Sequence, residues 1–260
     1  MRSILLVAAL LAALPCAAVL IRSDREDAEY LELATRYPSS VMLSAPDGEG
    51  VLIASRWVLT AAHRVKAIQE MKTPPKLVFG GREYAIQSIF AHPEWKKGNP
   101  FDIGLILLRE PVEGIAPTPM HRDKDEEGKT VIFVGHGYTG KIGDKGVREN
   151  WDRKGRAAIN TVDRVSPRVL GLRIKPPEEA SDLQGAAAPG DSGGPLFLDT
   201  PAGIRVVGIG YATDEISNDG IIGNVGDWQL YARVSAFAEW IDATMFKAAV
   251  EEAGTIRKDR

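Results

Sequence analysis

The sequence predicts an all-β protein. Of its 260 residues, 26 are glycine and 16 are proline, so turns interrupt the chain often. Hydrophobic residues make up 44%, and from Val41 onward they form short runs rich in Val, Ile and Leu between turn-forming clusters. A chain of this length buries a substantial core, as one large β unit or two smaller ones. Disordered, collagen-like and coiled-coil proteins are poor matches to this composition.

Residues 1–18, MRSILLVAALLAALPCAA, have the organisation of an export signal. Basic Arg2 precedes an apolar run that is too short to cross a bilayer, and small residues follow it. We expect cleavage near Ala18 and a secreted or periplasmic protein with no membrane anchor. A lipoprotein acylated on Cys16 is the weaker alternative, because Pro15 stands where a small residue should precede the acylated cysteine. Cys16 is the only cysteine, so the mature chain would hold no disulfide.

Seven apolar runs are expected to supply the β-strands, because they are short, aliphatic and separated by turn formers. They lie at residues 50–63, 76–80, 102–108, 130–137, 195–198, 205–212 and 228–234.

The end of the chain changes period. Apolar side chains recur there at intervals of three and four residues, at Phe237, Trp240, Ile241 and Met245. This spacing predicts an amphipathic helix that docks on the body, with Ser235 as a candidate N-cap.

The charges are nearly balanced, with 32 Lys and Arg against 35 Asp and Glu and a formal net charge of -3. The global charge therefore offers no attraction to phosphate backbones or anionic lipid. We expect no nucleic-acid partner.

The strongest local motif is Gly-Asp-Ser-Gly-Gly-Pro at 190–195. Such a run can be an ordinary tight turn. The glycines also allow the backbone to aim amide hydrogens at a point beside the Ser192 hydroxyl, which would stabilise an oxyanion. A serine hydroxyl needs a neighbouring imidazole to take its proton, and a third group to fix the tautomer of that imidazole.

The chain has four histidines, and taken alone each is more often structural than catalytic. His63 closes an apolar run in which small alanines permit close packing. His92 and His121 are expected at the surface, and His136, between two glycines, is expected to be packed or hydrogen-bonded. Asp102 precedes a run of apolar residues, so its carboxylate needs a donor partner, and an imidazole would serve.

Together these pieces resemble the trypsin-like serine peptidase family. Four motifs match in the family's order, at 59–63 (LTAAH), 102–107 (DIGLIL), 190–195 (GDSGGP) and 231–234 (YARV). Weaker matches lie at 92–95 and 135–140, so the resemblance covers about residues 41–247.

The resemblance implies two six-stranded antiparallel β-barrels with the active site in the cleft between them, followed by the C-terminal helix. The domain division would be 1–18 for the signal peptide, 19–120 for the N-terminal segment and first barrel, and 121–260 for the second barrel and helix.

The resemblance also implies catalytic functions for matching residues. Ser192 would attack the acyl carbon, His63 would act as general base and then general acid, and Asp102 would orient the imidazolium. The backbone amides of Gly190 and Ser192 would form the oxyanion hole. No metal or organic cofactor is required. The implied partner is a polypeptide substrate, with a protein inhibitor as a second candidate, and we expect a monomer.

The sequence departs from the family at the specificity pocket. Trypsins carry an aspartate six residues before the catalytic serine, and Ala186 stands there in this chain, so Lys/Arg specificity is not expected. The wall would run through Tyr211, Ala212 and Thr213, and Gln229 stands where glycine is usual. These larger side chains predict a narrowed pocket that prefers small or medium apolar residues.

A second departure concerns maturation. Members of the family often pair a newly freed N-terminal ammonium with the aspartate before the serine, here Asp191, but no Ile-Val-Gly-Gly-like start is present. The terminus freed near Val19 or Ile21 and an internal arginine are the two candidate cations, and an animal-type zymogen switch is the weaker alternative. Arg64 replaces a cysteine of animal members, which predicts nearer relatives among bacterial exported proteins.

Three other functions compete with an active peptidase. A catalytically inactive binding relative would keep the fold without needing the triad and the glycines that this chain retains. A heat-shock periplasmic protease would carry a further peptide-binding module and usually Asn before the serine. An esterase of unrelated fold needs its histidine after the nucleophile, whereas all four histidines here precede Ser192.

Overall fold

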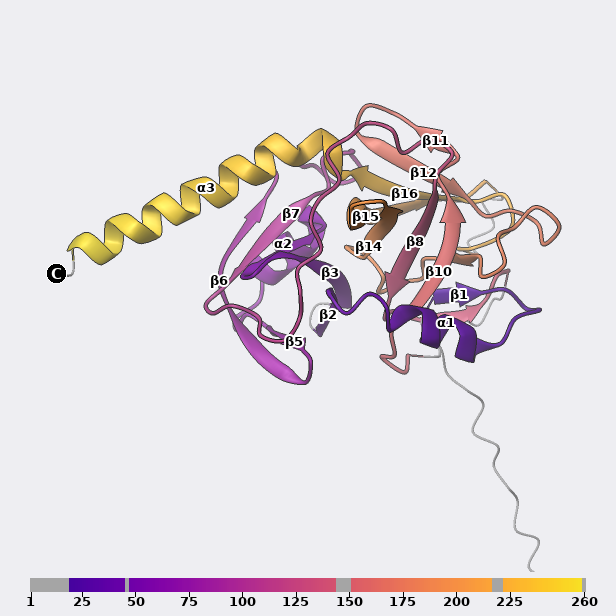
Figure 1. The fold of residues 1–260 in the computed structure, drawn as a ribbon, viewed down its shortest axis with the longest axis horizontal. Coiled ribbons are helices and arrows are strands. Elements are labelled where there is room, and N and C mark those ends of the chain that lie inside the picture. The colour runs from indigo at the N-terminus through magenta and orange to yellow at the C-terminus, as the bar shows by residue number, and fades with distance from the viewer. Residues whose placement is uncertain (1–18, 45–46, 144–150, 217–221, 259–260) are drawn as a thin grey trace, which may run out of the picture.

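The computed structural model describes residues 19–44, 47–143, 151–216 and 222–258. In these residues it contains two large barrel-like antiparallel sheets, a small third sheet and three helices (Figure 1). This confirms the predicted all-β fold with a C-terminal helix. The signal expected over 1–18, including Cys16, lies outside the described residues.

The first sheet contains six described strands in the order β2-β3-β4-β7-β6-β5, all antiparallel. Its edge strands β2 and β5 also contact each other, which curls the sheet towards a barrel. The strands are β2 (Ser40–Ser44), β3 (Asp47–Ala54), β4 (Trp57–Thr60), β5 (Lys76–Phe79), β6 (Arg82–Ala91) and β7 (Gly104–Leu108).

The second sheet contains seven described strands in the order β10-β8-β14-β15-β16-β12-β11, one more than expected because the two-residue β11 extends its edge. The strands are β8 (Thr130–Gly135), β10 (Arg156–Thr161), β11 (Arg164–Val165), β12 (Val169–Arg173), β14 (Pro195–Thr200), β15 (Gly203–Asp214) and β16 (Trp228–Arg233).

The N-terminal segment lies on the second sheet rather than the first. Strand β1 (Val19–Ile21) pairs in parallel with β9 (Thr139–Lys141) and antiparallel with β13 (Gly185–Ala186). Helix α1 (Asp27–Ala34) packs on β10, where the buried Arg156 guanidinium binds Asp27. The segment then crosses to the first sheet to begin β2 (Figure 1).

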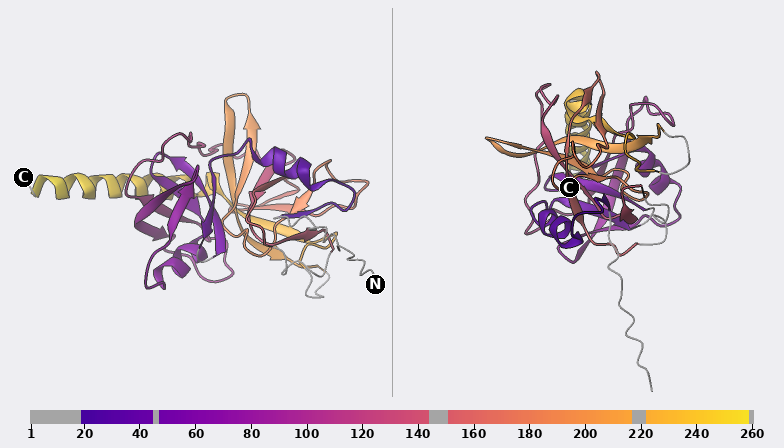
Figure 2. Two further views of the ribbon diagram at one scale, coloured as in Figure 1. Left: turned by 90° about the horizontal axis from the view of Figure 1, so that it is seen from below. Right: turned by 90° about the vertical axis from the view of Figure 1, so that its right-hand side faces the viewer.

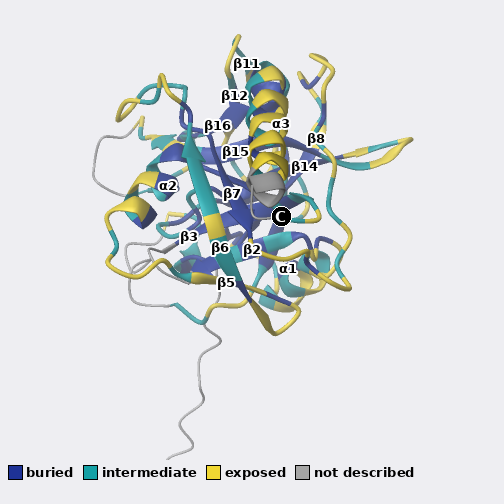
Figure 3. Cartoon of the chain, turned by 90° about the vertical axis from the view of Figure 1, so that its left-hand side faces the viewer, coloured by how far each residue is buried: buried dark blue, intermediate teal, exposed yellow. Residues whose placement is uncertain are grey.

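The other two helices are α2 (Ala62–Gln69), which follows β4, and α3 (Val234–Lys258), which follows β16. Ser235 was expected as the N-cap of α3 but lies inside the helix, where its hydroxyl donates to Glu126. The start of α3 packs on the body, and its later turns project past the first sheet and are largely exposed (Figures 2 and 3). Of the helices described, none is long and apolar enough to span a bilayer.

Each sheet encloses its own apolar cluster, and a third cluster joins the two. This joining cluster includes Leu59 and Leu105 from the first sheet and Val134 and Phe197 from the second. Tyr37 stacks on Phe197 with ring centroids 4.8 Å apart. The interface therefore fixes the end of β4 against the loop before β14, where the motif residues lie.

Candidate functional site

His63 and Asp102 come together at the first sheet. His63 is the second residue of α2 and Asp102 lies just before β7, and β4 and β7 are neighbours. His63 Nδ1 lies 2.7 Å from Asp102 Oδ2, and the His63 amide donates to Asp102 Oδ1 at 2.8 Å. Two contacts to one buried carboxylate fix the orientation of the ring. With the hydrogen on Nδ1, Nε2 is the nitrogen that can accept a proton.

The loop between β13 and β14 places Ser192 in a tight turn, residues 189–194, which we call the nucleophile turn. Gly190 has a φ of +97° and Gly193 a φ of +90°, conformations that disfavour any side chain. A Cβ on Gly193 would stand 2.3 Å from the carbonyl oxygen of Glu49 and 3.3 Å from the amide of Ala61. The nucleophile turn thus packs against β3 at Glu49 and against the end of β4 at Thr60, three residues before His63.

Some backbone groups of the nucleophile turn have hydrogen-bond partners and others do not. The Ser192 carbonyl accepts from the amide of Glu49 at 2.8 Å, and the Gly193 amide donates to Gly210. Across the described chain, the amides of Gly190 and Ser192 and the Ser192 hydroxyl make no hydrogen bond. Two amide donors therefore stay available beside the hydroxyl, as stabilisation of an oxyanion would need.

Within the nucleophile turn, the Asp191 side chain is buried. Its two oxygens accept from the amides of Gly137 at 2.7 Å and Ala188 at 2.8 Å. Burial, with the nearby Glu49 carboxylate, raises the pKa of Asp191 to about 8. In the described part of the chain Asp191 has no lysine or arginine partner, so the internal arginine, one of the two candidate cations, is not found there.

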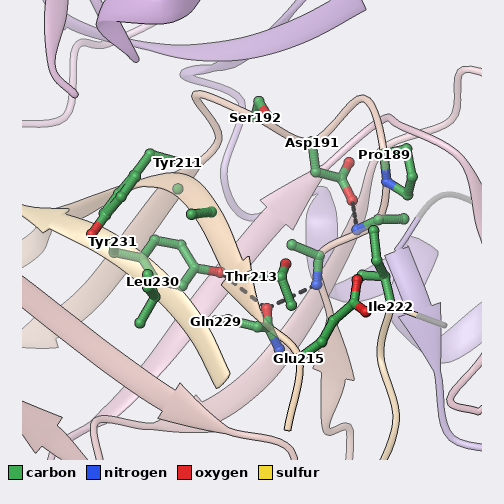
Figure 4. Close-up of a pocket in the computed structure, with 14 residues that line it drawn as sticks. Pro189, Asp191, Ser192, Tyr211, Thr213, Glu215, Ile222, Gln229, Leu230 and Tyr231 are labelled. Carbon is green, nitrogen blue, oxygen red and sulfur yellow. Dashed lines mark hydrogen bonds between the residues drawn. The ribbon is translucent and has the colours of Figure 1, made fainter. Parts of the chain in front are cut away.

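A cavity of about 320 Å³ opens beside Ser192 (Figure 4). Tyr211, Ala212, Thr213 and Gln229, all expected from the sequence, line it. The Gln229 side-chain oxygen accepts from the amide of Ala187 at 2.8 Å, and its nitrogen donates to the Gly185 carbonyl at 3.3 Å. Gln229 thus satisfies the backbone groups at the base of the cavity.

The predicted lining of the cavity differs from the observed lining at three residues. Ala186 does not line the cavity, because it is fully buried in β13 and pairs there with Leu20. The sequence reasoning also missed Glu215 and Ile222, which face the cavity opposite Tyr211 (Figure 4). No motif marks these two residues, since only the return of the chain from β15 to β16 brings them to this cavity.

All three remaining histidines are largely enclosed by other residues, although two of them were expected at the surface. His92 and His121 are buried, not at the surface. His92 packs against the rings of Phe237 and Trp240 on α3, and His121 Nε2 lies 2.7 Å from Asp125. The prediction for His136 is confirmed, since it binds Glu49 through both its amide and its ring. Within the described residues no cluster of His, Cys, Asp and Glu could hold a metal ion.

Comparison with known proteins identifies the family. The family model described as Trypsin matches residues 32–241, a span that includes both sheets and every motif residue. The chain belongs to the trypsin family. Relatives in this family include Complement C1s subcomponent of Sus scrofa, 24% identical over 80% of this chain and 34% of that protein. Phenoloxidase-activating factor 3 of Holotrichia diomphalia is 28% identical over 74% of this chain and 62% of its own length.

Serine protease SP24D of Anopheles gambiae is a further trypsin-family relative, 30% identical over 75% of this chain and 71% of its own length. The chain thus spans less than two thirds of the first two relatives. All three are animal proteins, so relatives among bacterial exported proteins stay a prediction.

Proposed function

We propose that the protein is a serine endopeptidase that cleaves peptide bonds through an acyl-enzyme. The observation that carries this proposal is the pairing of His63 with Asp102 beside a nucleophile turn whose two amide donors are unengaged. Gly190 and Ser192 are only half-buried, so a substrate carbonyl oxygen can reach both donors.

In this mechanism Ser192 Oγ attacks the substrate carbonyl while His63 Nε2 takes its proton. Asp102 holds the Nδ1–H tautomer and stabilises the imidazolium that forms. The amides of Gly190 and Ser192 bind the oxyanion. His63 then protonates the leaving amine, and water repeats the cycle on the acyl-enzyme. The hydrogen bond from Ser192 to His63 forms when substrate closes the site, since such contacts often tighten only in the complex.

Covalent labelling of the nucleophile tests the proposal. A sulfonyl fluoride or an organophosphate should add to Ser192, which mass spectrometry of the peptide that contains it would show, and abolish cleavage of a denatured protein substrate. Ser192→Ala is the matched control and should neither label nor cleave. A folded protein that does not label would favour the inactive, binding-only relative.

We infer a preference for small or medium apolar residues on the amino side of the cleaved bond. The size of the cavity and the neutral amide of Gln229 at its base support this. Glu215 supports the opposite specificity, because a carboxylate that faces the cavity could bind a basic side chain. A scan of peptide substrates separates the two: Glu215→Gln should leave cleavage after alanine or valine unchanged, but should abolish cleavage after lysine if that occurs.

We further infer export with cleavage near Ala18, and the α-ammonium of Val19 as the cation for Asp191. Strand β1 supports this, because Val19 is fully buried and pairs with Thr139, two residues after the Gly137 amide that binds Asp191. Val19 also has a φ of 69°, which is strained for a β-branched residue. Cleavage of the peptide bond before Val19 would remove that strain. N-terminal sequencing of the exported protein tests the cleavage site.

A further inference from the structure

Glu49 is a fully buried carboxylate at the junction of the two sheets. It lies in β3 of the first sheet, and its exposed fraction is 0%. Glutamate is almost never buried to this extent unless it is paired.

The partner of Glu49 comes from the second sheet. His136, which follows β8, donates its amide to Glu49 Oε1 at 2.8 Å, and His136 Nδ1 lies 2.9 Å from Glu49 Oε2. Burial raises the pKa of Glu49. Burial lowers the pKa of His136, but the charge and the hydrogen bond of Glu49 outweigh it, so the pKa of His136 is raised. The ionisable groups close enough to shift the pKa of the imidazole are Glu49, Asp191 and Arg156.

The backbones of the same two segments hold the nucleophile turn from both sides. The Glu49 amide donates to the Ser192 carbonyl at 2.8 Å, and the Glu49 carbonyl accepts from Thr60 Oγ1 at 2.6 Å. Next to His136, the Gly137 amide donates to Asp191 Oδ1 at 2.7 Å. The contact between Glu49 and His136 therefore links the two amides that hold the turn. The Gly137 amide binds Asp191, and the Glu49 amide binds the Ser192 carbonyl.

We propose that Glu49 and His136 are positioning residues that fix the nucleophile turn, so that the amides of Gly190 and Ser192 point at the substrate oxygen. With the Asp191 side chain held by the Gly137 amide and the Ser192 carbonyl held by the Glu49 amide, the Ser192 amide between them has little freedom to rotate. The inference rests on the proposed endopeptidase activity, because only a reaction through an oxyanion needs this orientation.

Glu49→Ala is the first test. We expect kcat to fall about 10- to 100-fold with KM within about twofold, which is less than the 10²- to 10³-fold cost of deleting an oxyanion donor outright. Affinity for a peptide boronic acid, whose tetrahedral adduct occupies the oxyanion hole, should fall by the same factor. The double variant Glu49→Ala with His136→Ala should lose no more kcat than the more impaired of the two single variants, because both substitutions remove the same contact.

Glu49→Gln provides a readout that a merely structural function would not move. Its amide can accept from the His136 amide and donate to Nδ1 of a neutral imidazole, but a protonated Nδ1 would face a donor. Because burial disfavours a charged imidazole once the Glu49 carboxylate is gone, both contacts can be kept in this variant. We expect Glu49→Gln to retain kcat and peptide boronic acid affinity within about threefold of wild type at pH 8, whereas Glu49→Ala keeps its loss of about 10- to 100-fold at the same pH.

Glu126→Ala is the matched control, because Glu126 is also fully buried and pairs with Arg233 away from the nucleophile turn. An equal loss of kcat in this variant, a rise in KM instead of a fall in kcat, or a Glu49→Gln variant as impaired as Glu49→Ala at pH 8 would each overturn the proposal. If Glu49→Ala does not fold, His136→Ala tests the same contact. A wild type that labels on Ser192 while the variants keep its kcat refutes the positioning function alone, whereas an unlabelled wild type refutes the endopeptidase itself.

Discussion

Asp191→Asn should change stability in opposite directions at low and high pH when the chain extends beyond Val19 on its N-terminal side. The native carboxyl has a pKa of about 8 against its ordinary value of 3.8, because it is buried next to Glu49. An acid whose pKa is raised by folding keeps its proton in the folded state between these values and loses it in the unfolded chain. The free energy of unfolding therefore falls as the pH rises through this window.

The size of the effect follows from the width of the window. About 1.4 kcal/mol is lost per pH unit, so the upper limit between pH 4 and pH 8 is about 6 kcal/mol. Asparagine does not titrate, but its amide can accept only one of the two backbone hydrogen bonds at this site, which costs about 1–3 kcal/mol. Asp191→Asn should thus be less stable than wild type near pH 4.5 and more stable by about 3 kcal/mol at pH 8.

Urea unfolding at several pH values measures this effect in two forms of the protein. One form keeps a short extension before Val19, and the other is cut by a protease so that Val19 carries the α-ammonium. In the cut form the ammonium should lower the pKa of Asp191, and Asp191→Asn should be destabilising throughout pH 5–7.5. Equal pH slopes in the two forms would refute the ammonium as the counter-ion. No slope in the extended form would refute the raised pKa.

Three further outcomes are expected. Asp102→Asn should lower kcat about 10⁴-fold at pH 7, because an amide facing His63 favours the wrong tautomer, and a loss under tenfold would contradict that pairing. Gly193→Ala should lower the free energy of unfolding by about 3 kcal/mol or more, since its Cβ would collide with a backbone carbonyl at a φ of +90°; an unchanged urea midpoint would exclude this clash. Gln229→Ala should cost about 1–3 kcal/mol by leaving the Ala187 amide without its acceptor, which thermal unfolding would detect, and equal stability would show that water replaces the side chain.

Local pattern predicted the strands that are most apolar. The runs at 102–108 and 205–212 correspond to β7 and β15, whose centres are continuously buried. The run at 76–80 corresponds to β5, in which buried Leu77 and Phe79 alternate with exposed residues. Strands β10 and β12 were missed, since small and polar residues weaken their pattern and the pairing with β8 and β16 decides their conformation.

The pairing of His63 with Asp102 could be predicted because each sits in a local motif. The contact of Glu49 with His136 could not, since no motif marks Glu49 and nothing local to His136 indicates which residue it binds. Likewise, His92 was expected at the surface because Pro93 follows it, and only the docking of α3 buries it.

The sequence by itself determined the β class, the terminal helix and the candidate residues for acid–base and nucleophilic chemistry, because periodicity, turn composition and short motifs are properties of neighbours along the chain. The tertiary structure decided which groups surround Asp191, what lines the cavity beside Ser192 and where the segment from Val19 lies. These depend on contacts between residues far apart in the sequence, such as Gly137 with Asp191 or Val19 with Thr139, and burial at such contacts, rather than residue type, sets the charge and orientation of each group.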